Sequence, residues 1–73
     1  MKVVIKSVTD HKFNNKHRGI IGDVRELTLG KTMVLAGEGV SYNAYTSNVE
    51  DITIHGVTIT VTTVNTIYTM ELL

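Results

Sequence analysis

A two-residue alternation near the carboxyl end of the chain constrains the fold more than any other feature of the sequence. Three apolar residues alternate there with three threonines: Val57, Ile59 and Val61 with Thr58, Thr60 and Thr62. Because successive side chains of a β-strand point to opposite faces, this pattern predicts a strand with one apolar face and one threonine face. No window of the chain shows the i, i+3, i+4, i+7 apolar stripe of an amphipathic helix, so we expect little or no helix.

Two candidate turns extend this strand into a three-stranded meander. A two-residue turn at His55-Gly56 pairs Ile52 with Ile59, and a second turn centred on Val64-Asn65 pairs Ile59 with Met70. Valine is poorly suited to a tight turn, so the second loop is expected to be wider than two residues. A one-residue slip would turn each side chain to the other face, yet both turns predict one shared apolar face. That face comprises Ile52, Ile54, Val57, Ile59, Val61, Tyr68, Met70 and Leu72.

The amino-terminal half is less regular. We predict a first strand over residues 2–9 and a hairpin over residues 24–38, in which Leu27 opposes Leu35 and Leu29 opposes Met33. This register leaves a three-residue loop, Gly30-Lys31-Thr32.

Residues 10–23 and 39–48 are expected to be irregular loops. Valine, isoleucine and threonine make up 28 of the 73 residues, and β-branched side chains favour a pleated surface over a helix. We therefore predict a single all-β domain over residues 1–73. Its expected architecture is a small antiparallel barrel or sandwich of five to six strands, SH3-like or OB-like.

The size of the chain favours self-association. A domain of 73 residues buries only about 60% of the surface that its unfolded chain exposes, and without cysteine it has no disulfide to add stability. A homo-oligomer is the expected route to further burial. No apolar run approaches the roughly 20 residues of a membrane span, and the first residues lack a signal-peptide pattern. An intracellular, reducing location is expected. The zero net charge argues against general nucleic-acid binding.

The sequence does not suggest an enzyme, a metal site or a cofactor. The three histidines lack a nearby carboxylate cluster, and no serine lies in a nucleophile motif. Gly30-Lys31-Thr32 matches the last three letters of a P-loop but lacks the first glycine and a following helix. We interpret it as a hairpin loop.

Three segments are candidates for binding. Residues 1–18 carry a formal charge of +4 and the remainder −4, and the basic groups are densest in residues 11–18. Their donors suit phosphate oxygens, and Phe13 could stack on a base; the alternative is a solvated loop that balances the acidic remainder. Residues 42–48, rich in tyrosine and hydroxyl groups, form either a recognition loop or a cap on the core. The threonine face either packs on a partner or faces water.

Four short motifs are spread over most of the chain: Thr46-Ser47-x-Val49, Thr63-x-Asn65-Thr66-x-Tyr68, the loop residues Asp10 to Asn14 and the Gly30-Lys31 hairpin. Together they resemble motifs of small β-rich proteins of phages and prophages. The characterised members of that group include inhibitors of host defence. Some sequester nucleotide immune signals in pockets at oligomer interfaces, and others bind a host protein directly, as anti-CRISPR proteins do. The resemblance implies such a role in the cytoplasm of a bacterial host.

Two functional hypotheses follow. The first is a non-enzymatic oligomer that binds a small anionic, nucleotide-like ligand. Its candidate residues are Lys12, Phe13, Asn14, Asn15, Lys16, His17, Arg18, Tyr42, Tyr45, Thr46, Ser47, Asn65 and Tyr68. The second is a protein-interaction module that meets a host protein through the threonine face or a sheet edge. A structural phage component without a ligand is a third possibility.

Overall fold

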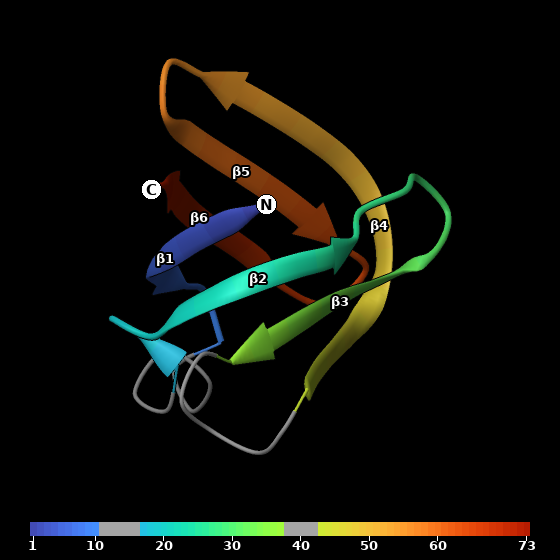
Figure 1. The fold of residues 1–73 in the computed structure, drawn as a ribbon. Coiled ribbons are helices and arrows are strands. Elements are labelled where there is room, and N and C mark those ends of the chain that lie inside the picture. Colours follow the sequence, from blue (N-terminus) through green and yellow to red (C-terminus); the bar gives the residue numbers. More distant parts are fainter. Residues whose placement is uncertain (11–16, 38–42) are drawn as a thin grey trace.

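The computed structural model describes residues 1–10, 17–37 and 43–73, and these residues form six β-strands. The strands are β1 (Lys2–Val8), β2 (Ile21–Glu26), β3 (Thr32–Gly37), β4 (Asn43–His55), β5 (Thr58–Thr63) and β6 (Ile67–Leu72). Each strand pairs antiparallel with the next one in the chain, and β6 pairs with β1 to close a barrel (Figure 1). The predicted all-β fold with little or no helix is confirmed. In the described ranges, no helix is long and apolar enough to cross a membrane.

Apolar side chains fill the barrel interior and alternate with outward-facing ones along each strand. In β5, Ile59 and Val61 are fully buried, whereas Thr58 and Thr60 lie half-buried on the outer face. The buried apolar residues are Val3, Ile5, Val8, Val24, Met33, Leu35, Val49, Ile59, Val61, Tyr68 and Met70. Each fully buried aliphatic side chain stabilises the fold by roughly 1.5–3 kcal/mol, so this single core supplies the main driving force.

The hairpin of β5 and β6 has the predicted register. Val61 opposes Tyr68 and Ile59 opposes Met70. The connecting loop is wider than two residues, as the valine within it suggested, and Thr63 closes it with its side chain. The Thr63 hydroxyl accepts a hydrogen bond from the Thr66 N–H at 3.1 Å and donates one to the Thr66 carbonyl oxygen at 2.8 Å.

The turn between β4 and β5 lies one residue later than predicted. Its two central residues are Gly56 and Val57, so His55 opposes Thr58 and Ile54 opposes Ile59. Gly56 has a φ of 58°, and a two-residue hairpin of type II′ requires its left-handed glycine at the first central position. The correction moves the register by an even number of residues. Ile52, Ile54 and Ile59 therefore still share one face, but the structure leaves two residues of the predicted apolar face exposed, Ile54 near the hairpin tip and Val57 in the turn.

The predicted register of the hairpin between β2 and β3 is wrong. Val24, not Leu27, opposes Leu35, and a bulge at Arg25 then places Glu26 opposite Val34. The loop consequently runs over residues 27–31, outside both strands, and Leu29 is exposed rather than paired with Met33. Two hydrogen bonds of 2.8 Å hold this loop against β4, from the Gly30 N–H to the Val49 carbonyl and from the Val49 N–H to the Lys31 carbonyl.

Two predicted loops are partly strand. β2 begins at Ile21, inside the segment expected to be irregular up to residue 23, and β4 begins at Asn43, inside the expected loop 39–48. β4 has 13 residues because it pairs with β3 through its first half and with β5 through its second half. The polar composition of the first half suggested a loop, but its backbone forms the ladder with β3. Residues 11–16 and 38–42 lie outside the described residues.

Candidate functional site

Six of the thirteen predicted ligand residues lie outside the described part of the chain: Lys12, Phe13, Asn14, Asn15, Lys16 and Tyr42. His17 and Arg18 are described and lie in the turn that leads into β2. The His17 carbonyl accepts a hydrogen bond from the Ile20 N–H at 3.1 Å, and the Gly19 N–H donates to the Ile5 carbonyl at 2.7 Å. These bonds hold the turn beside β1.

The predicted ligand residues on β4 differ in their exposure and in their hydrogen-bond partners. Tyr45 is 68% exposed. The Thr46 hydroxyl accepts a hydrogen bond from the Met33 N–H at 3.0 Å, close to a bulge in the β3–β4 ladder. The Ser47 hydroxyl accepts one from the Asn65 N–H at 3.1 Å. The structure therefore brings Ser47 and Asn65 together, whereas the Thr46 hydroxyl bonds to β3.

Tyr68 belongs to the barrel core. It opposes Val61 of β5 and Val8 of β1 and is buried. Burial raises the pKa of its phenol, and the negative charge of Asp10 adds to this effect. Tyr68 thus lies in the core, whereas Tyr45 is exposed on β4.

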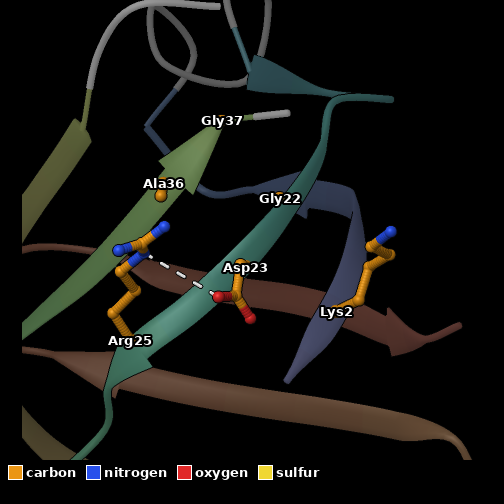
Figure 2. A pocket seen from close by; sticks show the side chains of 6 residues that line it. All are labelled: Lys2, Gly22, Asp23, Arg25, Ala36 and Gly37. Carbon is orange, nitrogen blue, oxygen red and sulfur yellow. Dashed lines mark ion pairs between the residues drawn. The ribbon is translucent and has the colours of Figure 1, made fainter. Parts of the chain in front are cut away.

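A hollow of about 410 Å³ lies over β1, β2 and β3, away from these predicted positions. Its lining residues are Lys2, Gly22, Asp23, Arg25, Ala36 and Gly37. The strand register assembles this set, because Lys2 opposes Asp23 and Asp23 opposes Ala36 on the next strand. Figure 2 shows the Lys2 and Arg25 side chains on either side of Asp23. We call this site the β1–β3 hollow.

Small residues form the floor of the β1–β3 hollow. Gly22 opposes Gly37 across the β2–β3 ladder. A Cβ atom at Gly22 would lie 2.9 Å from the Ala36 carbonyl oxygen and 3.2 Å from a Leu35 methyl group, so only glycine fits without a backbone shift. Gly22 itself is buried, so the partly exposed small residues of the floor, between the longer Lys2 and Arg25 side chains, are Ala36 and Gly37.

The electrostatics of the β1–β3 hollow are dominated by cations. The carboxylate of Asp23 lies 2.7 Å from the α-ammonium of Met1 and 3.8 Å from Nε of Arg25. The hydrogen bond from the Met1 ammonium is the main cause that lowers the pKa of Asp23. Desolvation, the second-largest effect, opposes it, and the charges of that ammonium, Arg25 and Lys2 lower the pKa further. Asp23 thus remains ionised at neutral pH, surrounded by three positive groups.

This arrangement suits an anion. Arginine and lysine donate charge-assisted hydrogen bonds to carboxylate and phosphate oxygens. Among the described residues that line the hollow, Lys2 and Arg25 supply two cations and Asp23 supplies one carboxylate. In the part of the chain that is described, no group of three histidine, aspartate or glutamate side chains is placed to hold a metal ion.

Local sequence reasoning missed the β1–β3 hollow. Lys2 is about twenty positions from Asp23 and Arg25, the three belong to no motif, and only the pairing of β1 with β2 brings Lys2 to the other two. The one available signal was the excess of basic residues near the amino end. No protein-family model, curated protein or solved structure matches this chain.

Proposed function

We propose that this protein is a non-enzymatic binding protein that takes a small anionic ligand of the nucleotide type in the β1–β3 hollow. The observation that carries the proposal is the placement of Lys2 and Arg25 on either side of Asp23, the one carboxylate among the described residues that line the hollow. Small-molecule sites in proteins have volumes of about 300–1,000 Å³, and the β1–β3 hollow is within that range at about 410 Å³.

The two cationic side chains have complementary roles in this proposal. Arg25 directs Nε toward Asp23, so the terminal nitrogens at the far end of its planar guanidinium are the donors for a phosphate group. Lys2 approaches from the neighbouring strand and supplies a second positive charge. Gly37 is partly exposed and has no side chain, which allows a flat group, such as a sugar or a base, to approach the backbone closely.

The biological role is the part of the proposal that the sequence resemblance supports. In that role the protein acts in the cytoplasm of a phage-infected bacterium and sequesters a nucleotide immune signal. The basic loop that contains Lys12, Lys16 and Arg18 remains a second candidate for ligand contacts, so the experiment has to separate the two regions.

Calorimetric titration with cyclic dinucleotides and with ADP-ribose tests the proposal. Saturable binding is expected for the native protein and for a Lys16→Ala, Arg18→Ala double variant. It is expected to be lost in a Lys2→Ala, Arg25→Ala double variant, which removes two exposed charges from the β1–β3 hollow. A Lys6→Ala, Lys31→Ala double variant removes the same charge from exposed sites outside the hollow and serves as the control.

The outcome distinguishes the alternatives. Loss of binding only in the Lys16→Ala, Arg18→Ala variant moves the site to the basic loop. Equal weakening in all three variants indicates attraction by general charge and contradicts a defined site. No heat with any nucleotide overturns the proposal.

One observation favours a protein-interaction module as the second candidate. Thr53, Thr60 and Thr69 lie side by side across β4, β5 and β6 on the outer face, and partly exposed Ile67 lies beside them on β6. Hydroxyl and methyl groups together can contact a partner without a large desolvation cost. Loss of capture of a host protein by a Thr60→Glu variant would support this function, and unchanged capture would exclude this face.

A further inference from the structure

Within residues 1–10, 17–37 and 43–73, no strand pairs with one edge of β4 over its second half. β4 pairs with β3 from Asn43 to Asn48, and the loop before β3 bonds to Val49. Beyond Val49, β4 pairs only with β5 among the described residues. Figure 1 shows β5 along one side of this half of β4. We call residues 51–55 on the other side the β4 edge.

The direction of the backbone groups at the β4 edge follows from the neighbouring ladder. The Leu72 N–H donates to the Val57 carbonyl at 2.7 Å, so alternate residues of β5 from Val57 onward direct their backbone groups toward β6. The residues between them, Thr58 and Thr60, then direct theirs toward β4. Their partners His55 and Thr53 direct theirs back toward β5.

Ile52 and Ile54 therefore direct their N–H and C=O groups toward the open side. No backbone or side-chain partner for these four groups occurs within the part of the chain that is described. The Ile54 side chain is 61% exposed and Val57, at the hairpin tip, is 57% exposed. An unpaired edge with apolar side chains is a template for another strand.

The sequence of the β4 edge is complementary to itself. In an antiparallel pairing around a two-fold axis at Thr53, Ile52 of one copy opposes Ile54 of the other. Because both residues direct backbone groups outward, each of the two resulting pairs exchanges two hydrogen bonds. Asp51 then opposes His55 of the other copy, so a carboxylate meets an imidazole N–H at each end of the ladder.

The alternative registers lack this complementarity. Moving the axis to Ile52 brings Ile54 toward Glu50, an apolar residue toward a charged one. Moving the axis to Ile54 places Ile52 opposite Gly56 and leaves Asp51 without an opposing imidazole. Cross-strand apolar pairs and opposite charges stabilise a sheet, so the register around Thr53 is favoured.

We propose that the β4 edge is the interface of a symmetric dimer, in which β4 of a second copy of this chain pairs antiparallel around Thr53. The two barrels then share one continuous sheet, and the isoleucines of both copies cover one another. An interface of this kind is isologous, since the same residues serve both copies. The inference is independent of ligand binding in the β1–β3 hollow.

Native mass spectrometry and sedimentation over a range of protein concentrations test the dimer. The native protein is expected to populate a dimer that an Ile54→Lys variant loses. The matched control is Val64→Lys, since Val64 is also an exposed β-branched residue, 60% exposed, and lies in the loop between β5 and β6. This control is expected to dimerise as the native protein does.

A cysteine cross-link tests the register. The chain has no cysteine of its own, and Thr53→Cys places two thiols opposite each other in a non-hydrogen-bonded pair, where Cα atoms lie about 4.5 Å apart and a disulfide can form. Asp51→Cys is the control on the same edge, since the two copies of position 51 lie far apart in this register. Faster cross-linking at position 53 than at position 51 is expected.

The proposal is overturned by a native protein that stays monomeric at every concentration. A dimer retained in Ile54→Lys, or lost equally in Val64→Lys, also overturns it. Faster cross-linking at position 51 than at position 53 contradicts the register.

Discussion

The substitution Ile59→Ala tests the alternation on which the fold rests. Ile59 is fully buried, and its neighbour across the β4–β5 ladder, Ile54, is mostly exposed. Removing three buried carbon groups from Ile59 costs about 2.4 kcal/mol, at about 0.8 kcal/mol each. The cavity left behind raises the expected loss in the free energy of unfolding to about 3–4 kcal/mol. A chain of this length has a total stability of roughly 4–11 kcal/mol, so the effect is a large part of the whole.

The matched control is Ile54→Ala, which makes the same chemical change at the paired position. Exposed substitutions change the free energy of unfolding by about 0.5 kcal/mol or less. Thermal unfolding followed by circular dichroism is expected to show a Tm lower by about 15–25 °C for Ile59→Ala and by only a few degrees for Ile54→Ala. The measurement uses dilute protein, since association through the β4 edge would add to the apparent stability. Equal losses in Tm for the two variants would refute the inward orientation of Ile59.

Three further predictions concern charge and backbone conformation. Because the pKa of Asp23 is lowered in the folded protein, its ionised carboxylate stabilises the fold at pH values above the ordinary pKa of 3.8, and this contribution is lost as the pH falls below 3.8. The stability of an Asp23→Asn variant, measured by unfolding as a function of pH, is therefore expected to differ from that of the native protein near neutrality and to converge with it in acid. A constant difference in stability at every pH would contradict this. Because the pKa of Tyr68 is raised in the folded protein, the unfolded chain loses the phenol proton first, and stability falls as the pH rises above 10.0. A Tyr68→Phe variant is expected to lose less stability than the native protein in this alkaline range. The same alkaline loss of stability in both proteins would contradict the raised pKa. Gly56→Ala forces a side chain into the left-handed region, so chemical denaturation is expected to show a loss of about 1–2 kcal/mol, and no loss would contradict the observed turn.

The carboxyl-terminal meander could be predicted because residues close together in the sequence determine both its alternation of apolar and polar side chains and its turns. The alternation from Val57 to Val61 and the loop at Val64 were enough to give the register of β5 with β6. The turn before β5 was misplaced by one residue, since the sequence marks a glycine but does not say which turn position it occupies. The pairing of His55 with Thr58 decides this.

The amino-terminal half could not be predicted to the same depth because its ladders are interrupted. Bulges at Arg25 and in the β3–β4 ladder change which residues oppose each other, and no pattern in the sequence predicts these bulges. The pairing of Leu27 with Leu35 matched two apolar residues but ignored the inward positions of Gly22 and Val24.

The β1–β3 hollow depends on contacts between distant parts of the chain. Lys2, Asp23 and Ala36 become neighbours only when three strands pair, and the small size of Gly22 matters only beside the β3 backbone. The basic loop could be identified from the sequence because its charged residues lie close together within residues 11–18. The hollow carries fewer charges, but the strands fix their positions.

Site-resolved NMR with pyrophosphate and with ADP-ribose is the most direct test of the central proposal that the β1–β3 hollow binds a nucleotide-type anion. On titration, the backbone amide signals of Gly22, Asp23 and Gly37 are expected to shift in a saturable way, while those of Gly56 and Val64, outside the hollow, stay in place. Saturable shifts that leave the three hollow amides unchanged, or no shift with either compound, would contradict it.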